Sequence, residues 1–589
     1  MGSVALAHPQ APEDHRLGPL DLALILLLLV FVAWYVHAQV DLGGRPEEDA
    51  AMLLRYSKHV AEGRGIVWNV GEPPVDGATD FLFMGLVAAV HRMGPSLEGA
   101  AQGVGLLAHA LTAVLIFLGI RTLWGGSGRL ALIPAVFFAV GPGMRHLAAC
   151  YGTPLFVLSA AVSWLLAARL VRASCERLKR DSLLFALSAL VMGLARPEGV
   201  FLGGFFLLGA LYARKGSGAR PILAAFLGVF LTLGLAYFLW RWHYFAYPLP
   251  NPFYKKGAGI LHLHSLRQSL RDLGALGLPF VLVLPIGLLL GPARRLSAAA
   301  LFAVLAFVAL WVLISDETNY VMRFRAPILP VVLTAWVPAW QGLVERVRAA
   351  RRTPAWVGAA MALMASAGLA AWQHGRYHYV APQRMGLYDA ALMLRDYAQR
   401  DYSLVTSEAG LLPLYSTWRA VDAWGLNDRF IAHHGEVTEE YLDRYRPEVI
   451  VFHAYFSPGV SEEGPRVENR SLGPRWYRMV MTLKAYAERN GYVLAACFGR
   501  NAWDTHWYFV RTGFLQSAAI VARIRALDYY WDGEPTVDFT AEGRSLPGFD
   551  HTPLTSGHEP SGEDHEDRSP VRQLVRSPQG DLRLPAGRR

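Results

Sequence analysis

Cysteine and charged residues are both scarce in this sequence. Three cysteines stand among 589 residues, and Asp, Glu, Lys and Arg together make up 17% of the chain. So few and so widely separated thiols exclude a disulfide framework and a cysteine-rich zinc site. Soluble domains average about 25% charged residues, so the low charge also argues against an ordinary cytosolic enzyme.

Long hydrophobic runs take the place of the missing charge. Hydrophobic residues form 53% of the sequence and the mean hydropathy is +0.26, but the long apolar runs are confined to residues 18–373. The residues that follow have the composition of a soluble protein. The chain is therefore predicted to be a polytopic α-helical membrane protein with a water-soluble C-terminal part.

Eleven runs have roughly the length of a membrane-spanning helix, which needs about 20 apolar residues. They cover residues 18–38, 99–120, 129–147, 150–171, 182–196, 197–213, 221–244, 274–291, 297–315, 326–343 and 354–373. Residues 79–93 are apolar but short, and we expect them to lie along the membrane interface.

Basic residues in the short loops predict the orientation. Five loops carry them, with Arg121 and Arg129, Arg172–Arg180, Arg214–Arg220, Arg294–Arg295 and Arg346–Arg352. All five lie on one side if the N-terminus is inside and residues 79–93 do not span. The positive-inside rule makes that side cytoplasmic, so the soluble part is expected on the outer side of the membrane.

The soluble part alternates strand-like and helical patterns, which is typical of an α/β domain. Strands are predicted at Ser403–Thr406, Val449–His453, Tyr492–Ala496 and His506–Arg511, and helices at 384–400, 438–445 and 475–489. The predicted organisation is a cytoplasmic N-terminus at 1–17, a membrane domain at 18–375 with a first external loop at 39–98, an external α/β domain at 376–540, and a disordered polar tail at 541–589.

Positive charges on the predicted outer side break the orientation rule. They are Arg196, Arg241, Lys255, Lys256, Arg323 and Arg325. Any one of them can extend its charge to lipid headgroups, but six near external helix ends indicate a pocket for an anion.

Acidic residues follow the first span in the segment Pro46–Met52. Carboxylates at this place also stabilise helix N-termini, so a structural role stays open. The rest of the loop holds further charges, glycines and a tryptophan. Ionisable groups at membrane depth cost about 2.5–3.5 kcal/mol each, and for that reason they usually line a functional site.

Six segments resemble one family in order. The first is EDAAMLLRYSKHVAEGRGIVWNVGEPPVDGATDFLF, and the others are Tyr151–Phe156, Ala195–Gly199, Pro248–Lys256, Gly410–Ser416 and Asp422–Asp428. The pattern resembles the GT-C superfamily of glycosyltransferases that use polyprenyl-phosphate sugars, and in particular the mycobacterial-type terminal arabinofuranosyltransferases. It covers about residues 45–430. The chain departs from the family at Glu48, where Asp is usual, at Gly152, where Glu is usual, and at Asp80, where an amide or hydroxyl residue is usual.

The resemblance implies a GT-C fold with about eleven spans in a bacterial inner membrane. It also implies transfer of arabinofuranose, or another sugar, to a cell-envelope glycan or glycolipid on the outer face of that membrane. Asp49 would act as general base or nucleophile. Glu48 would support it, and the two would hold a divalent cation if one is used; no other cofactor and no nucleic acid is implied. The implied donor-phosphate ligands are Arg196, Lys255, Lys256, Arg323 and Arg325. The implied substrate contacts are Arg55, Tyr56, Trp68, Asn69, Asp80, Asn251 and Tyr254, and Tyr151 is a further candidate for stacking on a sugar.

A polytopic transporter or lipid-linked sugar flippase with an external binding domain is the alternative. Transporter sites usually lie on helices that are broken near the membrane midplane, in corresponding positions of two halves. The sequence has no evident paired interruption of this kind, and its acidic residues cluster in a loop.

Overall fold

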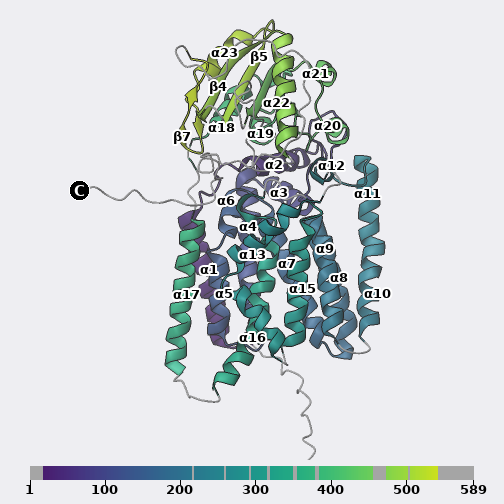
Figure 1. The fold of residues 1–589 in the computed structure, drawn as a ribbon, viewed down its shortest axis with the longest axis vertical. Coiled ribbons are helices and arrows are strands. Elements are labelled where there is room, and N and C mark those ends of the chain that lie inside the picture. The colour runs from purple at the N-terminus through teal and green to yellow at the C-terminus, as the bar shows by residue number, and fades with distance from the viewer. Residues whose placement is uncertain are drawn as a thin grey trace, which may run out of the picture. The chain divides into compact units, whose positions relative to one another are not determined.

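The chain forms two compact units, one ending at Ala381 and the other beginning at Pro382 (Figure 1). The structure is a computed structural model that describes residues 17–214, 218–257, 261–290, 293–314, 319–348, 355–378, 382, 384–454, 472–501 and 504–541. The predicted disordered tail lies outside the described residues apart from residue 541, as does the N-terminus before residue 17.

The first unit is helical. Its elements are α1 (Pro19–Gln39), α2 (Glu48–Ala61), α3 (Phe81–His91), α4 (Leu97–Leu118), η1 (Gly119–Leu123), α5 (Gly128–Ala139), α6 (Gly143–Ala148), α7 (Thr153–Arg172), α8 (Cys175–Ala195), α9 (Glu198–Ala213), α10 (Ala219–Val229), η2 (Phe230–Gly234), α11 (Leu235–Phe245), α12 (Asn251–Gly257), α13 (Leu263–Gly277), α14 (Phe280–Val283), η3 (Leu284–Leu289), α15 (Arg294–Leu310), η4 (Tyr320–Met322), η5 (Ala326–Ile328), α16 (Leu329–Arg348) and α17 (Ala355–Tyr377). Aliphatic and aromatic side chains from most of the long helices form its buried core.

Five helical segments among the described residues are long and apolar enough to cross a membrane. They are Pro19–Gln39, Leu97–Leu123, Thr153–Val171, Ala219–Phe245 and Tyr320–Val344. The other predicted spans coincide with helices that are shorter or less apolar, such as Gly128–Ala139 and Glu198–Ala213. A multi-pass helical membrane protein is therefore confirmed, while the count of eleven spans stays a prediction.

The predicted continuous span at 274–291 is wrong. The chain bends by 102° between Leu263–Gly277 and Phe280–Leu289. Pro279 stands at the break; it has no N–H to donate, and its ring disfavours helical backbone at the residue before it. The apolar run is thus divided between the end of one helix and a short second one.

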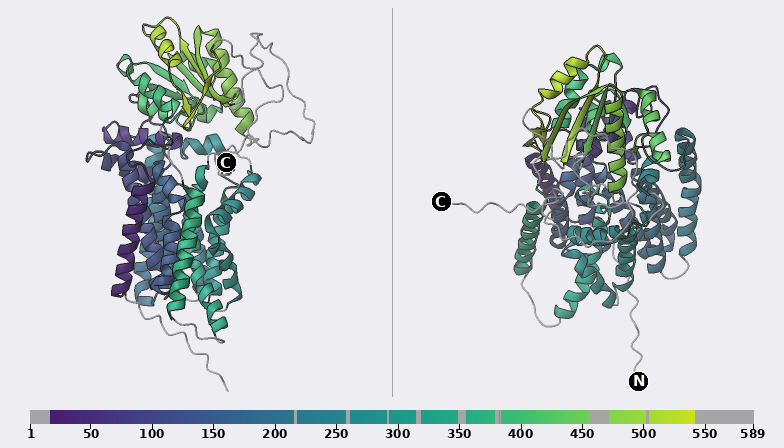
Figure 2. Two further views of the ribbon diagram at one scale, coloured as in Figure 1. Left: turned by 90° about the vertical axis from the view of Figure 1, so that its left-hand side faces the viewer. Right: turned by 45° about the horizontal axis from the view of Figure 1, so that its top comes forward.

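The short helices of the predicted first external loop lie across one end of the bundle. α2 and α3 run at this end, and α11 finishes there beside α12, whereas α10 begins at the opposite end (Figure 1; Figure 2, left). α3 spans only Phe81–His91, about 16 Å at 1.5 Å per residue, which is too short to cross the hydrocarbon core. The expectation that residues 79–93 do not span is consistent with this length.

The second unit is an α/β domain. Its elements are α18 (Gly386–Arg395), η6 (Ala398–Arg400), β1 (Ser403–Thr406), α19 (Leu411–Ser416), β2 (Arg419–Asp422), α20 (Arg429–His434), α21 (Glu439–Tyr445), β3 (Val449–Ala454), α22 (Leu472–Arg489), β4 (Tyr492–Asn501), β5 (Asp504–Arg511), α23 (Ser517–Arg525), β6 (Tyr530–Trp531), β7 (Glu534–Pro535) and β8 (Val537–Asp538). The four predicted strands are confirmed as β1, β3, β4 and β5.

The main sheet has the strand order β2-β1-β3-β5-β4-β8. β1 is parallel to β2 and β3, and the remaining pairs are antiparallel. All six residues of β3 are buried, as expected for a central strand. Ile450 and Phe452 share a core with Val480 and Leu483 of α22, so alternate residues of β3, including His453, face the other side of the sheet.

The segment Asp422–Asp428, which resembles the family motif, forms a turn closed by its own side chains. The Asp422 carboxylate accepts hydrogen bonds from the backbone N–H groups of Trp424, Gly425 and Asn427 at 2.8–3.1 Å. Gly425 has φ +96°, a conformation that glycine adopts without strain. This motif therefore has a structural role between β2 and α20.

Candidate active site

Asp49 lies in the first turn of α2, where its carboxylate meets an arginine from a distant segment. Arg323 Nη2 donates to Asp49 Oδ2 at 2.5 Å, and both side chains are largely buried, with 10% and 15% exposed for Arg323 and Asp49. The Arg323 guanidinium also lies 4.4 Å from the centre of the Tyr151 ring. Three segments that the sequence singled out separately are thus brought into one place.

The backbone that carries this arginine is strained. Val321 and Met322 have φ values of 52° and 56°, in the left-handed region that β-branched and bulky side chains rarely adopt. His146 Nε2 lies 3.0 Å from the Val321 carbonyl oxygen and holds the turn. Cys150, directly before Tyr151, also has a left-handed φ of 63°. Such residues cost of order 1–3 kcal/mol each and concentrate at functional sites.

Glu47 is a member of the cluster that the sequence reasoning missed. It precedes α2, and Tyr151 donates its hydroxyl to Glu47 Oε2 at 3.0 Å while Arg145 Nε lies 4.0 Å from Oε1. Burial is the largest influence on Glu47 and raises its pKa, against the opposite effects of Arg145 and Tyr151. The run of three acids was visible in the sequence, but the contacts of Glu47 with Tyr151 and Arg145 appear only in the structure.

A second carboxylate–arginine pair lies beside the first. Arg196 Nη1 is 2.6 Å from Asp80 Oδ1, and Arg196 Nη2 is 3.2 Å from Glu198 Oε1. The ring of Phe324 lies 5.2 Å from the Arg196 guanidinium and 5.0 Å from that of Arg323. Two of the predicted phosphate ligands, Arg196 and Arg323, therefore share one aromatic neighbour.

The departures at Gly152 and Asp80 are sterically linked. A Cβ atom at position 152 would lie 2.5 Å from Asp80 Oδ2 and 3.1 Å from Phe83 Cγ, both closer than such atoms pack. The carboxylate of Asp80 therefore occupies the space that a side chain at 152 would need. Asp80 in this chain holds a negative charge beside Arg196 where the family resemblance would place one on residue 152.

The predicted ligands on α12 are fixed to the first loop. The Asn251 N–H donates to the Asp76 carbonyl oxygen at 2.9 Å, and Asp76 receives two hydrogen bonds from the buried Arg241 at 2.7 and 2.5 Å. Lys255 is buried, while Lys256 and Tyr254 are half-buried. Their predicted contacts with substrate stay predictions.

Arg325 belongs to a second buried group of side chains. It donates to Ser269 Oγ at 3.0 and 2.6 Å, lies 3.6 Å from Asp272 Oδ2 and packs over the Trp311 ring at 4.7 Å. Its side chain is fully buried. This placement favours a structural ion pair with α13 over the predicted phosphate contact.

The predicted sugar contacts on α2 and the following turn form the core of the loop. Arg55 donates to the Trp68 carbonyl at 2.8 Å and to Asn69 Oδ1 at 3.0 Å, and its guanidinium lies 4.8 Å from the Trp68 ring. Tyr56 packs beside Trp68. All four side chains are buried, with Tyr56 fully so, and their position favours a role in holding the loop's shape.

On the sequence alone, a divalent cation, if one is used, is assigned to Glu48 and Asp49. Asp49 is paired with an arginine, whose positive charge opposes a cation at that carboxylate. Within the described part of the chain, one group of three His, Cys, Asp or Glu side chains lies close enough together to share a metal ion. It consists of Glu408, His453 and His506 of the α/β domain.

A family model described as a domain of unknown function, DUF8728, matches residues 367–512. The chain is 28% identical over 266 residues to a terminal β-(1→2)-arabinofuranosyltransferase of Mycobacterium tuberculosis. That match covers 42% of this chain and 41% of the relative, so it spans less than half of either protein.

Among solved structures, the chain is similar to ArnT from Cupriavidus metallidurans in the apo state, with a TM-score of 0.50 and 14% identity over 83% of this chain and 97% of that one. It is also similar to the oligosaccharyltransferase AglB from Archaeoglobus fulgidus, with a TM-score of 0.46 and 11% identity over 83% and 74% of the two chains. The likeness to ArnT shows the fold. The chain therefore has a GT-C-type helical membrane unit followed by an α/β domain, and it resembles a mycobacterial arabinofuranosyltransferase in sequence, as predicted.

Proposed function

We propose that the chain is a membrane glycosyltransferase that moves a sugar from a polyprenyl-phosphate donor to a glycan or glycolipid of the bacterial cell envelope, on the outer face of the membrane. The observation that carries the proposal is the contact between Asp49 and Arg323 beside Tyr151. The sequence similarity to an arabinofuranosyltransferase supports it and suggests a pentofuranose as the first sugar to test.

The residues around Asp49 and Arg323 provide a base for the acceptor and positive charge for the leaving group. The acceptor hydroxyl oxygen attacks the anomeric carbon, the bond from that carbon to the phosphate oxygen breaks, and the electron pair leaves with the polyprenyl phosphate. Asp49, acting as general base, takes the hydroxyl proton. The transition state has oxocarbenium character, which nearby carboxylates stabilise.

Arginine is suited to the leaving group because its planar fork pairs with phosphate oxygens. A donor phosphate would compete with Asp49 for Arg323 and so release the carboxylate for proton transfer. Arg196, which also lies near the Phe324 ring, is proposed as the second phosphate contact. The flat ring of Tyr151 is proposed to pack against the sugar.

A transporter is the second candidate, and the bend between α13 and α14 is the observation in its favour. Broken helices are common at transporter binding sites. The acidic residues of the cluster, however, lie on a loop helix at one end of the bundle, where a group-transfer reaction with an external acceptor is favoured.

One experiment separates the two candidates. Purified chain in nanodiscs is incubated with radiolabelled polyprenyl-phosphate arabinofuranose and an oligosaccharide acceptor, and a parallel sample is sealed in vesicles that contain the donor. We expect label in the oligosaccharide and no change in donor sidedness. Movement of donor between leaflets without any labelled oligosaccharide would contradict the enzyme and support the transporter.

A further inference from the structure

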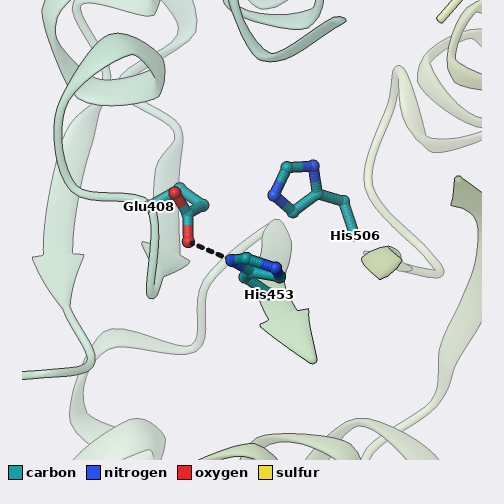
Figure 3. Close-up of side chains that lie close together, drawn as sticks. All are labelled: Glu408, His453 and His506. Atoms are coloured by element: carbon teal, nitrogen blue, oxygen red, sulfur yellow. Dashed lines mark ion pairs between the residues drawn. The ribbon is translucent and has the colours of Figure 1, made fainter. Parts of the chain in front are cut away.

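Three ligand-type side chains meet at one edge of the sheet in the α/β domain (Figure 3). Glu408 follows β1 by two residues, and His453 lies near the end of β3. β1 and β3 are parallel, so their carboxyl ends reach the same edge. His506 of β5 is the direct cross-strand partner of His453, which places both imidazoles on the same face of the sheet.

The spacing of these side chains suits a small cation. One ligand atom from each residue lies within 4.8 Å of the other two, and His453 Nδ1 is 3.4 Å from Glu408 Oε1. Zinc binds nitrogen and carboxylate oxygen at about 2.0–2.2 Å in tetrahedral geometry, which separates ligand atoms by roughly 3.3–3.6 Å. The pair of Glu408 and His453 already has this separation, and a small rotation of His506 completes the set.

Each imidazole is oriented by a partner on its other nitrogen. His453 Nε2 lies 2.7 Å from Asp504 Oδ1, and His506 Nδ1 lies 2.8 Å from the Tyr529 hydroxyl. Metal-binding histidines usually hold their second nitrogen in this way, which fixes the ring and directs the lone pair of the first nitrogen to the ion. The nitrogens that a shared ligand would use are His453 Nδ1, which faces Glu408, and His506 Nε2.

A buried nitrogen of His506 gives separate evidence for a ligand at this place. Its side chain is 4% exposed, and within the described ranges Nε2 has no hydrogen-bond partner. Its ring is stacked on Trp531, with ring centres 4.0 Å apart. A buried nitrogen without a partner is destabilising, and a bound ligand would remove that cost.

A metal-free ion pair explains only part of this arrangement. Burial alone would lower the pKa of His453, but its hydrogen bonds to Asp504 and Glu408 outweigh burial and raise the pKa to about 9. A protonated His453 between two carboxylates is therefore self-consistent. It gives no partner to His506 Nε2, and it does not account for a second buried imidazole turned toward the same point.

We infer that Glu408, His453 and His506 bind one divalent cation of the zinc class, with Asp504 and Tyr529 orienting the two histidines. Two imidazoles and one carboxylate form a donor set that zinc accepts, with a fourth position left for water or an external ligand. The site would join the ends of β1, β3 and β5 at this edge of the sheet. It is independent of the proposed sugar transfer, so either can fail without the other.

The test measures metal on the full chain, purified in detergent without a histidine tag. The protein is stripped with a chelator, dialysed against Zn²⁺ and analysed by mass spectrometry of the metal. We expect one Zn²⁺ per chain, its loss in His506→Gln, and its retention in the control His434→Gln, which changes an exposed histidine of α20. A variant with alanine at His551, His558 and His565 should also retain the metal, since these histidines are outside the proposed ligand set.

A second variant keeps the test decisive if His506→Gln fails to fold. Asp504→Asn preserves all three ligands and should bind one Zn²⁺ with about 10–100-fold lower affinity, the usual effect of removing an outer carboxylate. Three results would overturn the inference: no Zn²⁺ on the wild-type chain, equal affinity in Asp504→Asn, or loss of the metal only in the variant with the tail histidines replaced.

Discussion

The two clusters of ionisable residues differ in the partner that each carboxylate has. In the membrane unit, Asp49 and Asp80 are paired with Arg323 and Arg196. In the α/β domain, Glu408 and Asp504 are paired with an imidazole. Arginine keeps its proton at any accessible pH and can neither coordinate a metal nor release a proton, whereas imidazole can do both. The first arrangement is therefore suited to an anionic ligand and the second to a cation.

The clusters also differ in how the backbone builds them. His453 and His506 are adjacent because of ordinary strand register. Arg323 and Tyr151 each follow left-handed non-glycine residues, so their positions depend on local strain that the surrounding fold maintains. This difference leads us to expect that small changes disturb the first cluster more than the second.

The largest expected effect is that of Asp49→Asn. Without a base for the acceptor hydroxyl, the transfer rate should fall by about 10²–10⁴-fold, while the chain still binds one Zn²⁺. The measurement pairs the initial rate of label transfer with metal analysis of the same sample. A rate near that of the wild type would place the base on another residue, and loss of the metal would contradict the separation of the two clusters.

Arg323→Gln should have the second-largest effect. We expect a loss of about 10²–10³-fold in kcat/KM, the range typical of removing a group that stabilises developing charge. Arg323→Lys keeps the charge but not the planar fork and should fall between this variant and the wild type. Arg64→Gln is the control, because Arg64 lies on the loop that carries Asp49 and has 52% of its side chain exposed. An Arg323→Gln rate equal to that of Arg64→Gln would remove Arg323 from the phosphate site.

Because positions 152 and 80 are sterically linked, substitutions at these positions are expected to have non-additive effects on stability. Gly152→Glu alone drives its side chain into the Asp80 carboxylate, and overpacking of this kind costs about 1–3 kcal/mol, so both thermal stability and transfer should drop. Adding Asp80→Ser clears the space and leaves the new carboxylate beside Arg196. Recovery of most of the lost stability in the double variant is the expected result, and simple addition of two losses would show that the positions are independent.

The smallest effect concerns Glu47 and pH. Its pKa is raised in the folded chain, so the stability that protonation contributes is present at low pH and is lost as the pH rises through the folded-state pKa. Glu47→Gln removes this titration. The fall in melting temperature between pH 5 and pH 8 should therefore be smaller in the variant than in the wild type, and an equal or larger fall would mean that Glu47 is ionised at both pH values.

Much of the fold could be predicted because periodicity and hydrophobic length determine it. The strands β1, β3, β4 and β5 and most long helices follow from local pattern. Asp49 and Arg196 could be named from motif resemblance, and Arg323 from its positive charge on the predicted outer side. The bend at Pro279 was missed because the length of a hydrophobic run does not show whether the helix within it is straight or bent. Glu47 and the Glu408–His453–His506 group were missed because contacts between distant segments depend on strand order and on the angle at which loops return, and neither is encoded locally.

The most direct test of the division between the two clusters is a structure of the Asp49→Asn chain with a polyprenyl-phosphonate sugar that cannot be cleaved. We expect the phosphonate within hydrogen-bond distance of Arg323, and the anomeric carbon facing residue 49. A phosphonate bound at Lys255 and Lys256 with residue 49 directed elsewhere, or bound at His453 and His506, would contradict it.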